Sequence, residues 1–279
     1  MSDDTYKQVQ TRYGDIAKQT SNTNIQDNTE AAIAKAFGYS AADLSSLPGT
    51  ANLGLSCGNP VAYANMNQGE TVVDLGCGGG IDVFLAARKV GMEGKAIGID
   101  MTEEMIALAQ KNAEAAGLSN TLFIKARIDS IPLESSSIDC IISNCVINLV
   151  PRAEKLRVFR EIARLLKPGG RVAISDILAR KKLPAAIVND MVLYVGCIAG
   201  ASLVAEYREY LDEAGFGDIL IVDTNADINL YKQSSYLSQN SCCSTEAPAK
   251  TLTSGFSDVD FNEWVGSFQV YAVNGDSAA

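Results

Sequence analysis

An apolar run that leads directly into a cluster of glycines organises this sequence: Thr71-Val72-Val73-Asp74-Leu75-Gly76-Cys77-Gly78-Gly79-Gly80. The first five residues predict a short buried strand, and helix-forming residues 82–89 follow the glycines. A strand, a tight turn and a helix in this order place backbone amides where they can face a ligand without interference from a Cβ atom. The spacing is G-x-G-x-G with Ile81 in the sixth position, which departs from the dinucleotide fingerprint and disfavours a nicotinamide or flavin cofactor.

Strands and helices alternate downstream of this turn. We expect strands at 96–100, 121–125, 138–143, 172–177, 219–222 and 268–273. We expect one helix to begin after Thr102, a second to begin at Pro151 and a third to span 207–214. This order predicts an α/β fold whose parallel sheet is doubly wound, with helices on both faces. Thr102 is expected to cap its helix, next to two glutamates that suit the helix dipole. Upstream, residues 4–19 and 29–37 predict an N-terminal helical segment.

The composition excludes several classes of function. The net charge of -10 and the pI near 4.6 argue against a nucleic-acid partner, which requires a concentrated basic surface. Its best basic cluster, Arg180-Lys181-Lys182, is expected to be a solvated loop. No apolar stretch approaches the ~18 residues of a membrane span, and the acidic start Met1-Ser2-Asp3-Asp4 is unlike a signal peptide, so we expect a cytoplasmic protein without a membrane partner.

Seven cysteines and no histidine are the unusual features of the composition. An odd number of cysteines spread over a long chain disfavours a disulfide framework, and it favours reduced thiols with metal-binding or chemical roles. The absence of histidine disfavours reactions that need a general base, because histidine is the side chain most often used for that role, although Asp, Glu, Lys or Tyr can also serve.

Asp100 ends the second predicted strand about twenty residues after the glycines. An acid at this position accepts hydrogen bonds from both hydroxyls of a ribose. The alternative role, a helix-capping aspartate, is less favoured because Thr102 is expected to fill it.

Three motifs together resemble the seven-stranded S-adenosylmethionine methyltransferases: residues 74–80, Gly98-Ile99-Asp100 and Lys167-Pro168-Gly169-Gly170. The resemblance covers roughly residues 70–180 and implies a Rossmann-like seven-stranded sheet that binds S-adenosyl-L-methionine. It implies an adenine contact from the loop after the third strand and a methionine contact from the loop after the fourth. The implied cofactor residues are Asp74, Gly76, Gly78, Asp100, Met101, Ile128, Asp129 and Asn144.

Three further segments, around Cys57, Cys145 and Cys197, resemble the arsenite methyltransferases: residues 52–60, 143–149 and 194–201. The spacing of Tyr13-Gly14 also matches, so the similarity spans about residues 8–222, and it implies that Tyr13 belongs to a lid over the cofactor. The implied activity is methyl transfer to arsenite and methylated arsenicals in arsenic detoxification. The resemblance also implies a thiol reductant, glutathione or thioredoxin, with Cys57 as a participant.

The chemistry of these cysteines supports that function independently. Three convergent thiolates can hold trivalent arsenic as an As–S₃ unit, because soft centres prefer sulfur ligands. The arsenic lone pair is then the nucleophile, so the reaction needs positioning rather than a general base. Cys145 follows a strand end, where ligands gather in open α/β sheets, and the other two can reach the same edge.

Each cysteine also has a simpler interpretation, because cysteine is among the residue types most often buried in a core. We assign Cys77, in the glycine turn, and Cys140, inside a strand, to the structure. The pair Cys242-Cys243 lies in a polar stretch and is either an accessory site of arsenic capture or a redox-labile tail. A structural zinc site is disfavoured because close C-x₂₋₄-C pairs are lacking apart from Cys140 and Cys145.

These patterns divide the chain into three predicted regions: an N-terminal helical lid (1–48), a cofactor-binding domain (49–180) and a C-terminal region (181–279) that completes the sheet and substrate site and contains a flexible insertion at 224–264. The alternative enzyme is a small-molecule carbon or oxygen methyltransferase of the sterol or quinone type. A third hypothesis is a thiol-based metalloid sensor that keeps the fold without turnover.

Overall fold

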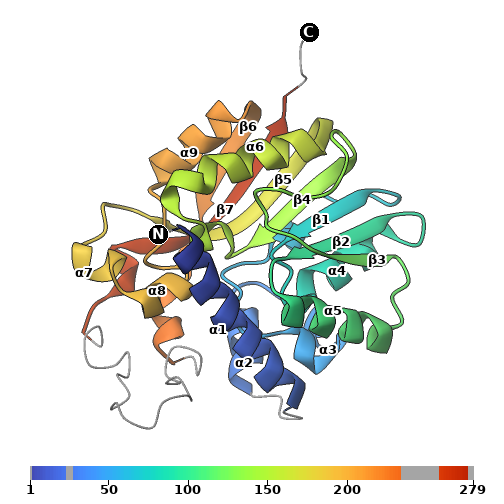
Figure 1. Cartoon of the computed structure of the whole chain (residues 1–279), viewed down its shortest axis with the longest axis horizontal. Coiled ribbons are helices and arrows are strands. Elements are labelled where there is room, and N and C mark those ends of the chain that lie inside the picture. The colour runs from blue at the N-terminus through green and yellow to red at the C-terminus, as the bar shows by residue number, and fades with distance from the viewer. Residues whose placement is uncertain (1, 23–27, 234–257, 276–279) are drawn as a thin grey trace.

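A mixed sheet of seven strands forms the centre of the computed structural model, which describes residues 2–22, 28–233 and 258–275 (Figure 1). The strand order is β3-β2-β1-β4-β5-β7-β6. This is the Rossmann-like sheet of class I methyltransferases that the sequence predicts. The strands are β1 (Thr71–Leu75), β2 (Lys95–Asp100), β3 (Thr121–Lys125), β4 (Ile138–Asn144), β5 (Leu166–Ala179), β6 (Phe216–Asp223) and β7 (Val265–Asn274).

Helices cover both faces of the sheet, because successive strand residues point to opposite sides. Val73 and Leu75 of β1 pack in a core cluster with α6 and α9, whereas the alternate residue Val72 packs in a second cluster with α4 and α5. The helices are α1 (Ser2–Asn22), α2 (Asn28–Ala36), α3 (Ala41–Ser45), α4 (Ile81–Val90), α5 (Glu103–Ala116), α6 (Lys155–Leu165), α7 (Ala185–Val188), α8 (Met191–Val195) and α9 (Val204–Glu213).

The expectation of an all-parallel sheet is wrong for its last strand. β7 pairs antiparallel with both β5 and β6, while the other observed pairs are parallel. β7 follows β6 in the sequence and lies beside it in the sheet, and neighbouring strands of this kind need no crossover when they run in opposite directions. Strand periodicity carries no information about direction, so the sequence does not reveal this reversal.

The N-terminal helix α1 is amphipathic in the way that its sequence predicts. Tyr6, Val9 and Ile16 are buried along one side of the helix. Val9 packs in a core cluster that also contains the three cysteines of the predicted substrate site and residues of the C-terminal region. α1 therefore lies against the carboxyl ends of the strands, where a ligand would bind.

Both described ends of the predicted insertion at 224–264 are ordered by mutual hydrogen bonds. The Ile228 backbone N–H donates to Asn262 Oδ1 at 2.8 Å, and the Phe261 N–H donates to Asn229 Oδ1 at 3.1 Å. Short 3₁₀ helices form at η5 (Ile228–Gln233) and η6 (Phe261–Glu263). Cys242 and Cys243 lie outside the described residues.

Candidate active site

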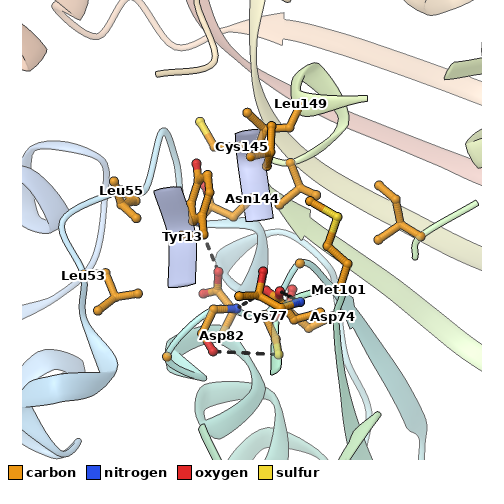
Figure 2. Close-up of a pocket in the computed structure, with 18 of the residues that line it drawn as sticks. Tyr13, Leu53, Leu55, Asp74, Cys77, Asp82, Met101, Asn144, Cys145 and Leu149 are labelled. Atoms are coloured by element: carbon orange, nitrogen blue, oxygen red, sulfur yellow. Dashed lines mark hydrogen bonds between the residues drawn. The ribbon is translucent and has the colours of Figure 1, made fainter. Parts of the chain in front are cut away.

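A cavity opens at the carboxyl ends of β1, β2 and β4 and is covered by α1 (Figure 2). Its empty space amounts to about 990 Å³ when the solvent at its open mouth is included. The sequence-predicted cofactor residues come together on its wall: Tyr13, Asp74, Gly76, Gly78, Asp100, Met101, Ile128, Asp129 and Asn144. These residues are distant in the sequence, so the sheet edge is what assembles them.

Glycine is required at positions in this turn, both by the backbone conformation and by close packing. Gly76 has a φ of 69°, and a Cβ atom there would lie 2.3 Å from a methyl group of Val146. Gly80, with a φ of 98°, occupies the N-cap of α4 in the left-handed region that side chains disfavour. The turn therefore brings backbone close to the cavity in a way that larger residues would prevent.

Asp100 both braces this turn and faces the cavity. Its Oδ2 accepts a hydrogen bond from the Gly78 N–H at 3.1 Å, and its Oδ1 accepts one from the Thr102 N–H at 2.8 Å. Thr102 occupies the N-cap of α5 but its side chain makes no capping bond, so the expected capping by Thr102 is wrong. The carboxylate of Asp100 takes over part of that role, and it also lines the cavity.

Three carboxyl groups make the cavity floor strongly acidic. Burial raises the pKa of Asp74 well above its usual value, and the charges of Asp82 and Asp100 raise it further. Burial also raises the pKa of Asp82 to about 6, against hydrogen bonds from Tyr39 and Asn144, and raises that of Asp100. A bound cation would relieve this repulsion, so the floor suits a positively charged ligand.

The opposite wall carries an ionic cluster that fastens α1. Arg127 donates to both carboxylate oxygens of Asp129 at 3.0 Å and to Glu154 Oε2 at 3.0 Å. Burial disfavours the charged form of Asp129, but the hydrogen bonds from Arg127 hold its pKa below the usual value. The Tyr6 hydroxyl of α1 donates to Glu154 at 3.0 Å, and the Arg127 guanidinium stacks 3.6 Å from the Tyr6 ring. Sequence reasoning missed Tyr6 and Glu154, which show no local motif.

The three predicted substrate cysteines converge beside this cavity, but two of them are joined. Cys57 and Cys145 form a disulfide with a Cα–Cα distance of 5.8 Å, and Cys145 also lines the cavity. The expectation of reduced thiols at all three positions is therefore wrong for this state of the protein. The two residues are separated by 88 positions, so the fold rather than any local spacing pairs them.

Cys197 is the free thiol of this group. Its Sγ donates to the Cys145 carbonyl oxygen at 2.8 Å, which places it next to the disulfide. Burial raises the pKa of Cys197 well above its usual value, and the Asp176 charge adds to this, whereas Lys155 and a hydrogen bond with Tyr13 oppose it. Tyr13 therefore contacts the cysteine group as well as the cofactor cavity.

A buried ionic network lies behind the cysteines and was not predicted. One carboxylate oxygen of Asp176 and the sulfurs of Cys57 and Cys145 all lie within 4.8 Å of one another. Lys155 is 1% exposed and donates to Asn148 Oδ1 at 3.0 Å, and the Asn148 amide donates to Asp176 Oδ1 at 2.9 Å. Burial raises the pKa of Asp176 to about 7 and lowers that of Lys155 to about 8. The one sequence feature that could have indicated this network is the single acid, Asp176, within the apolar strand 172–177.

The cysteines that were assigned to structure have different surroundings. Cys140 is fully buried in the core cluster on the α4 face of the sheet. Cys77 is 5% exposed and also lines the cavity, so a small side chain at this position shapes the cavity wall.

Comparison with known proteins gives a consistent family. The model of a family described as "Methyltransferase domain" matches residues 66–215. An arsenite methyltransferase of Halobacterium salinarum is 46% identical over 205 residues, which are 73% of this chain and 52% of that protein. The mouse arsenite methyltransferase is 33% identical over 228 residues, 77% of this chain and 58% of that protein. The chain thus spans about half the length of the curated relatives that it matches.

A solved structure agrees with these relatives. The crystal structure of an arsenic(III) S-adenosylmethionine methyltransferase from Chlamydomonas reinhardtii superposes with a TM-score of 0.58 and 26% identity, over 91% of this chain and 75% of that one. The resemblance to arsenite methyltransferases that the sequence shows is confirmed. Within the described residues, no helix combines the length and the apolar character that crossing a membrane requires. Because the family model matches more than half of the residues, the chain belongs to the methyltransferase domain family.

Proposed function

We propose that this protein is an S-adenosylmethionine-dependent methyltransferase that methylates trivalent arsenic. The observation that carries the proposal is the meeting of Cys57, Cys145 and Cys197 beside a cavity with methyltransferase architecture, whose wall includes Cys145. The similarity to proteins named arsenite methyltransferases supports the same substrate. A sterol or quinone methyltransferase would use the same cavity but would give the three cysteines no function.

The residues of the cavity fit S-adenosylmethionine, which supplies a methyl group on a positively charged sulfur. The Asp100 carboxylate lines the cavity and accepts hydrogen bonds from the ribose hydroxyls, and Ile128 and Asp129 form the wall for adenine. Asp74 lies in the acidic floor, which favours the cationic ammonium and sulfonium groups. Tyr13 covers the site from α1 and excludes water from it.

The cysteines act as arsenic ligands once the disulfide is reduced. Two molecules of a monothiol such as glutathione, or one dithiol such as reduced thioredoxin, convert the Cys57–Cys145 disulfide into two thiols and are themselves oxidised to a disulfide. Three thiols then replace the three hydroxyls of arsenous acid and release three waters. The arsenic lone pair forms the new As–C bond as the methyl–sulfur bond breaks, and the sulfur leaves as a neutral thioether.

The proposal also covers the remaining cysteines, the cellular location and the division of the chain into regions. We assign Cys242 and Cys243 to accessory capture of arsenic, and we expect the protein to act in the cytoplasm without a nucleic-acid partner. The proposed regions remain a helical lid (1–48), a cofactor domain (49–180) and a C-terminal region (181–279) that completes the substrate site.

The proposal is tested by incubating the protein with arsenite, glutathione and methyl-labelled S-adenosylmethionine, followed by separation of the arsenic species. Labelled methylarsenicals are the expected products. If no label is transferred while arsenite still protects the cysteines from alkylation, the protein is a metalloid-binding protein without turnover. If arsenite neither protects the thiols nor receives label, the arsenic assignment is wrong.

A further inference from the structure

The side-chain amide of Asn144 lies between the cofactor cavity and the Cys57 loop. It follows the buried part of β4, lines the cavity and immediately precedes Cys145 (Figure 2). Its Oδ1 accepts a hydrogen bond from the Cys57 backbone N–H at 3.1 Å. Its Nδ2 lies 2.8 Å from the Gly58 carbonyl oxygen, so the amide contacts the backbone of two successive loop residues, Cys57 and Gly58.

The orientation of this amide is fixed by its other neighbours. Nδ2 also lies 3.1 Å from Asp82 Oδ2 and 2.8 Å from the Tyr39 hydroxyl oxygen, and the Tyr39 O–H donates to Asp82 Oδ1 at 2.7 Å. If the amide were flipped, its oxygen would face the Asp82 carboxylate and the Gly58 carbonyl, and its NH₂ would face the Cys57 N–H. Asp82 and Tyr39 therefore direct Oδ1 toward Cys57.

The Cys57 loop is also held by residues of the C-terminal region. The Ser267 hydroxyl donates to the Cys57 carbonyl oxygen at 2.5 Å, and the Tyr231 hydroxyl donates to the Ser56 carbonyl oxygen at 2.7 Å. A Cβ atom at Gly58 would lie 2.5 Å from Ser175 Oγ, so the loop packs tightly against β5. The Cys57 N–H is thus bonded to a side chain that lines the cavity, whereas Ser267 and Tyr231 are not among the lining residues.

We propose that Asn144 is a positioning residue that couples cofactor binding to the placement of the Cys57 sulfur, through its hydrogen bonds with Asp82 and Tyr39. The proposal deepens the proposed function and rests on it for the identity of the arsenic ligand. Asp82 lines the cavity and is 2% exposed, while Tyr39 stands behind the cavity wall at 3% exposure.

The coupling has a physical origin in the acidic floor. A cationic group in the cavity favours the ionised form of Asp82, and a charged carboxylate accepts stronger hydrogen bonds from Asn144 and Tyr39 than a neutral carboxyl does. A better-fixed amide holds Cys57 opposite Cys145 more firmly. Since linkage is reciprocal, arsenic held by Cys57 must strengthen cofactor binding by the same factor.

The test measures arsenite binding by the full-length, phosphine-reduced protein in equilibrium dialysis, with and without saturating S-adenosylhomocysteine. This compound retains the ammonium group and does not turn over. In the wild type it should tighten arsenite binding by a factor within the range of about 5 to 150 that coupled sites show. Tyr39→Phe removes the hydroxyl that links Asp82 with Asn144 but no cavity-lining residue. It should reduce this factor while either ligand alone still binds, because only the direct contact between Asp82 and Asn144 remains.

Tyr63→Phe is the matched control, because Tyr63 is another largely buried tyrosine whose hydroxyl bonds to Ser175 Oγ at 3.1 Å instead. Tyr63→Phe should keep the wild-type factor. The loss in Tyr39→Phe then cannot be due to the general effect of removing a buried tyrosine hydroxyl. A second variant, Asn144→Asp, places an oxygen against Asp82 and Gly58 and should lose the factor as well. The inference is overturned if Tyr39→Phe keeps the wild-type factor or if the wild type binds arsenite without any effect of S-adenosylhomocysteine. If the wild type binds no arsenite, the proposed function itself fails.

Discussion

Replacement of Asp100 by alanine should weaken S-adenosylmethionine binding without unfolding the protein. Asp100 lines the cavity, and its two carboxylate oxygens also accept the backbone N–H groups of Gly78 and Thr102. A hydrogen bond to a charged group contributes about 1.5–3 kcal/mol, so the loss of one ribose bond predicts an affinity about 10- to 150-fold lower. Isothermal titration calorimetry with the reduced protein measures this change directly.

The control for Asp100→Ala is an aspartate that also accepts two hydrogen bonds but lies away from the cavity. Asp260 accepts from the Asn262 N–H at 3.0 Å and from Asn229 Nδ2 at 2.7 Å, in the C-terminal region. Asp260→Ala should lower the thermal midpoint but leave cofactor affinity unchanged. An Asp100→Ala protein that binds the cofactor as tightly as the wild type would refute the assignment of the ribose site.

Three further predictions concern pH, the lid and the Cys242-Cys243 pair. Cofactor affinity should fall as the pH is lowered through about 6, because protonation of Asp82, whose pKa burial raises to about 6, weakens the attraction for a cation. The same raised pKa makes the unliganded protein lose stability as the pH rises from the unfolded value of about 4 through 6; urea unfolding that shows the opposite trend would contradict this origin. Tyr6→Ala removes the ring that is stacked on Arg127 and should speed cofactor dissociation in stopped-flow experiments. An unchanged dissociation rate would show that this contact does not hold α1 over the cofactor. The double variant Cys242→Ser/Cys243→Ser should lose methylation mainly at low arsenite, whereas complete loss at saturating arsenite would place the pair in the catalytic site.

Local patterns predicted the elements that carry the cofactor site. The strand Thr71–Leu75 has the same limits in the structure as in the prediction. The reason is that a compact apolar run ends directly at a cluster of glycines, which marks the turn. The predicted cofactor residues line one cavity because parallel strands bring their carboxyl ends to the same edge. Such geometry follows from strand order alone.

Features that depend on tertiary contacts were missed. The direction of β7, the Cys57–Cys145 disulfide and the buried charges of Lys155 and Asp176 join residues far apart in the sequence. A buried lysine has no local signature, since its burial depends on acceptors such as the Gly200 carbonyl oxygen at 2.6 Å. Only the folded chain shows which polar residues are enclosed together.

The central claim, that three cysteines hold one arsenic atom beside the methyl donor, is tested most directly by single serine variants. Cys57→Ser, Cys145→Ser and Cys197→Ser are assayed for transfer of labelled methyl to arsenite and to monomethylarsenite, with S-adenosylmethionine binding as the check on the fold. Each replacement offers arsenic a harder oxygen ligand and should abolish methylation of arsenite, with losses that are far from additive. Monomethylarsenite needs only two thiolates, so Cys57→Ser should still methylate it. Near-normal turnover of arsenite by Cys145→Ser or Cys197→Ser would contradict the claim and return the protein to the general small-molecule methyltransferases.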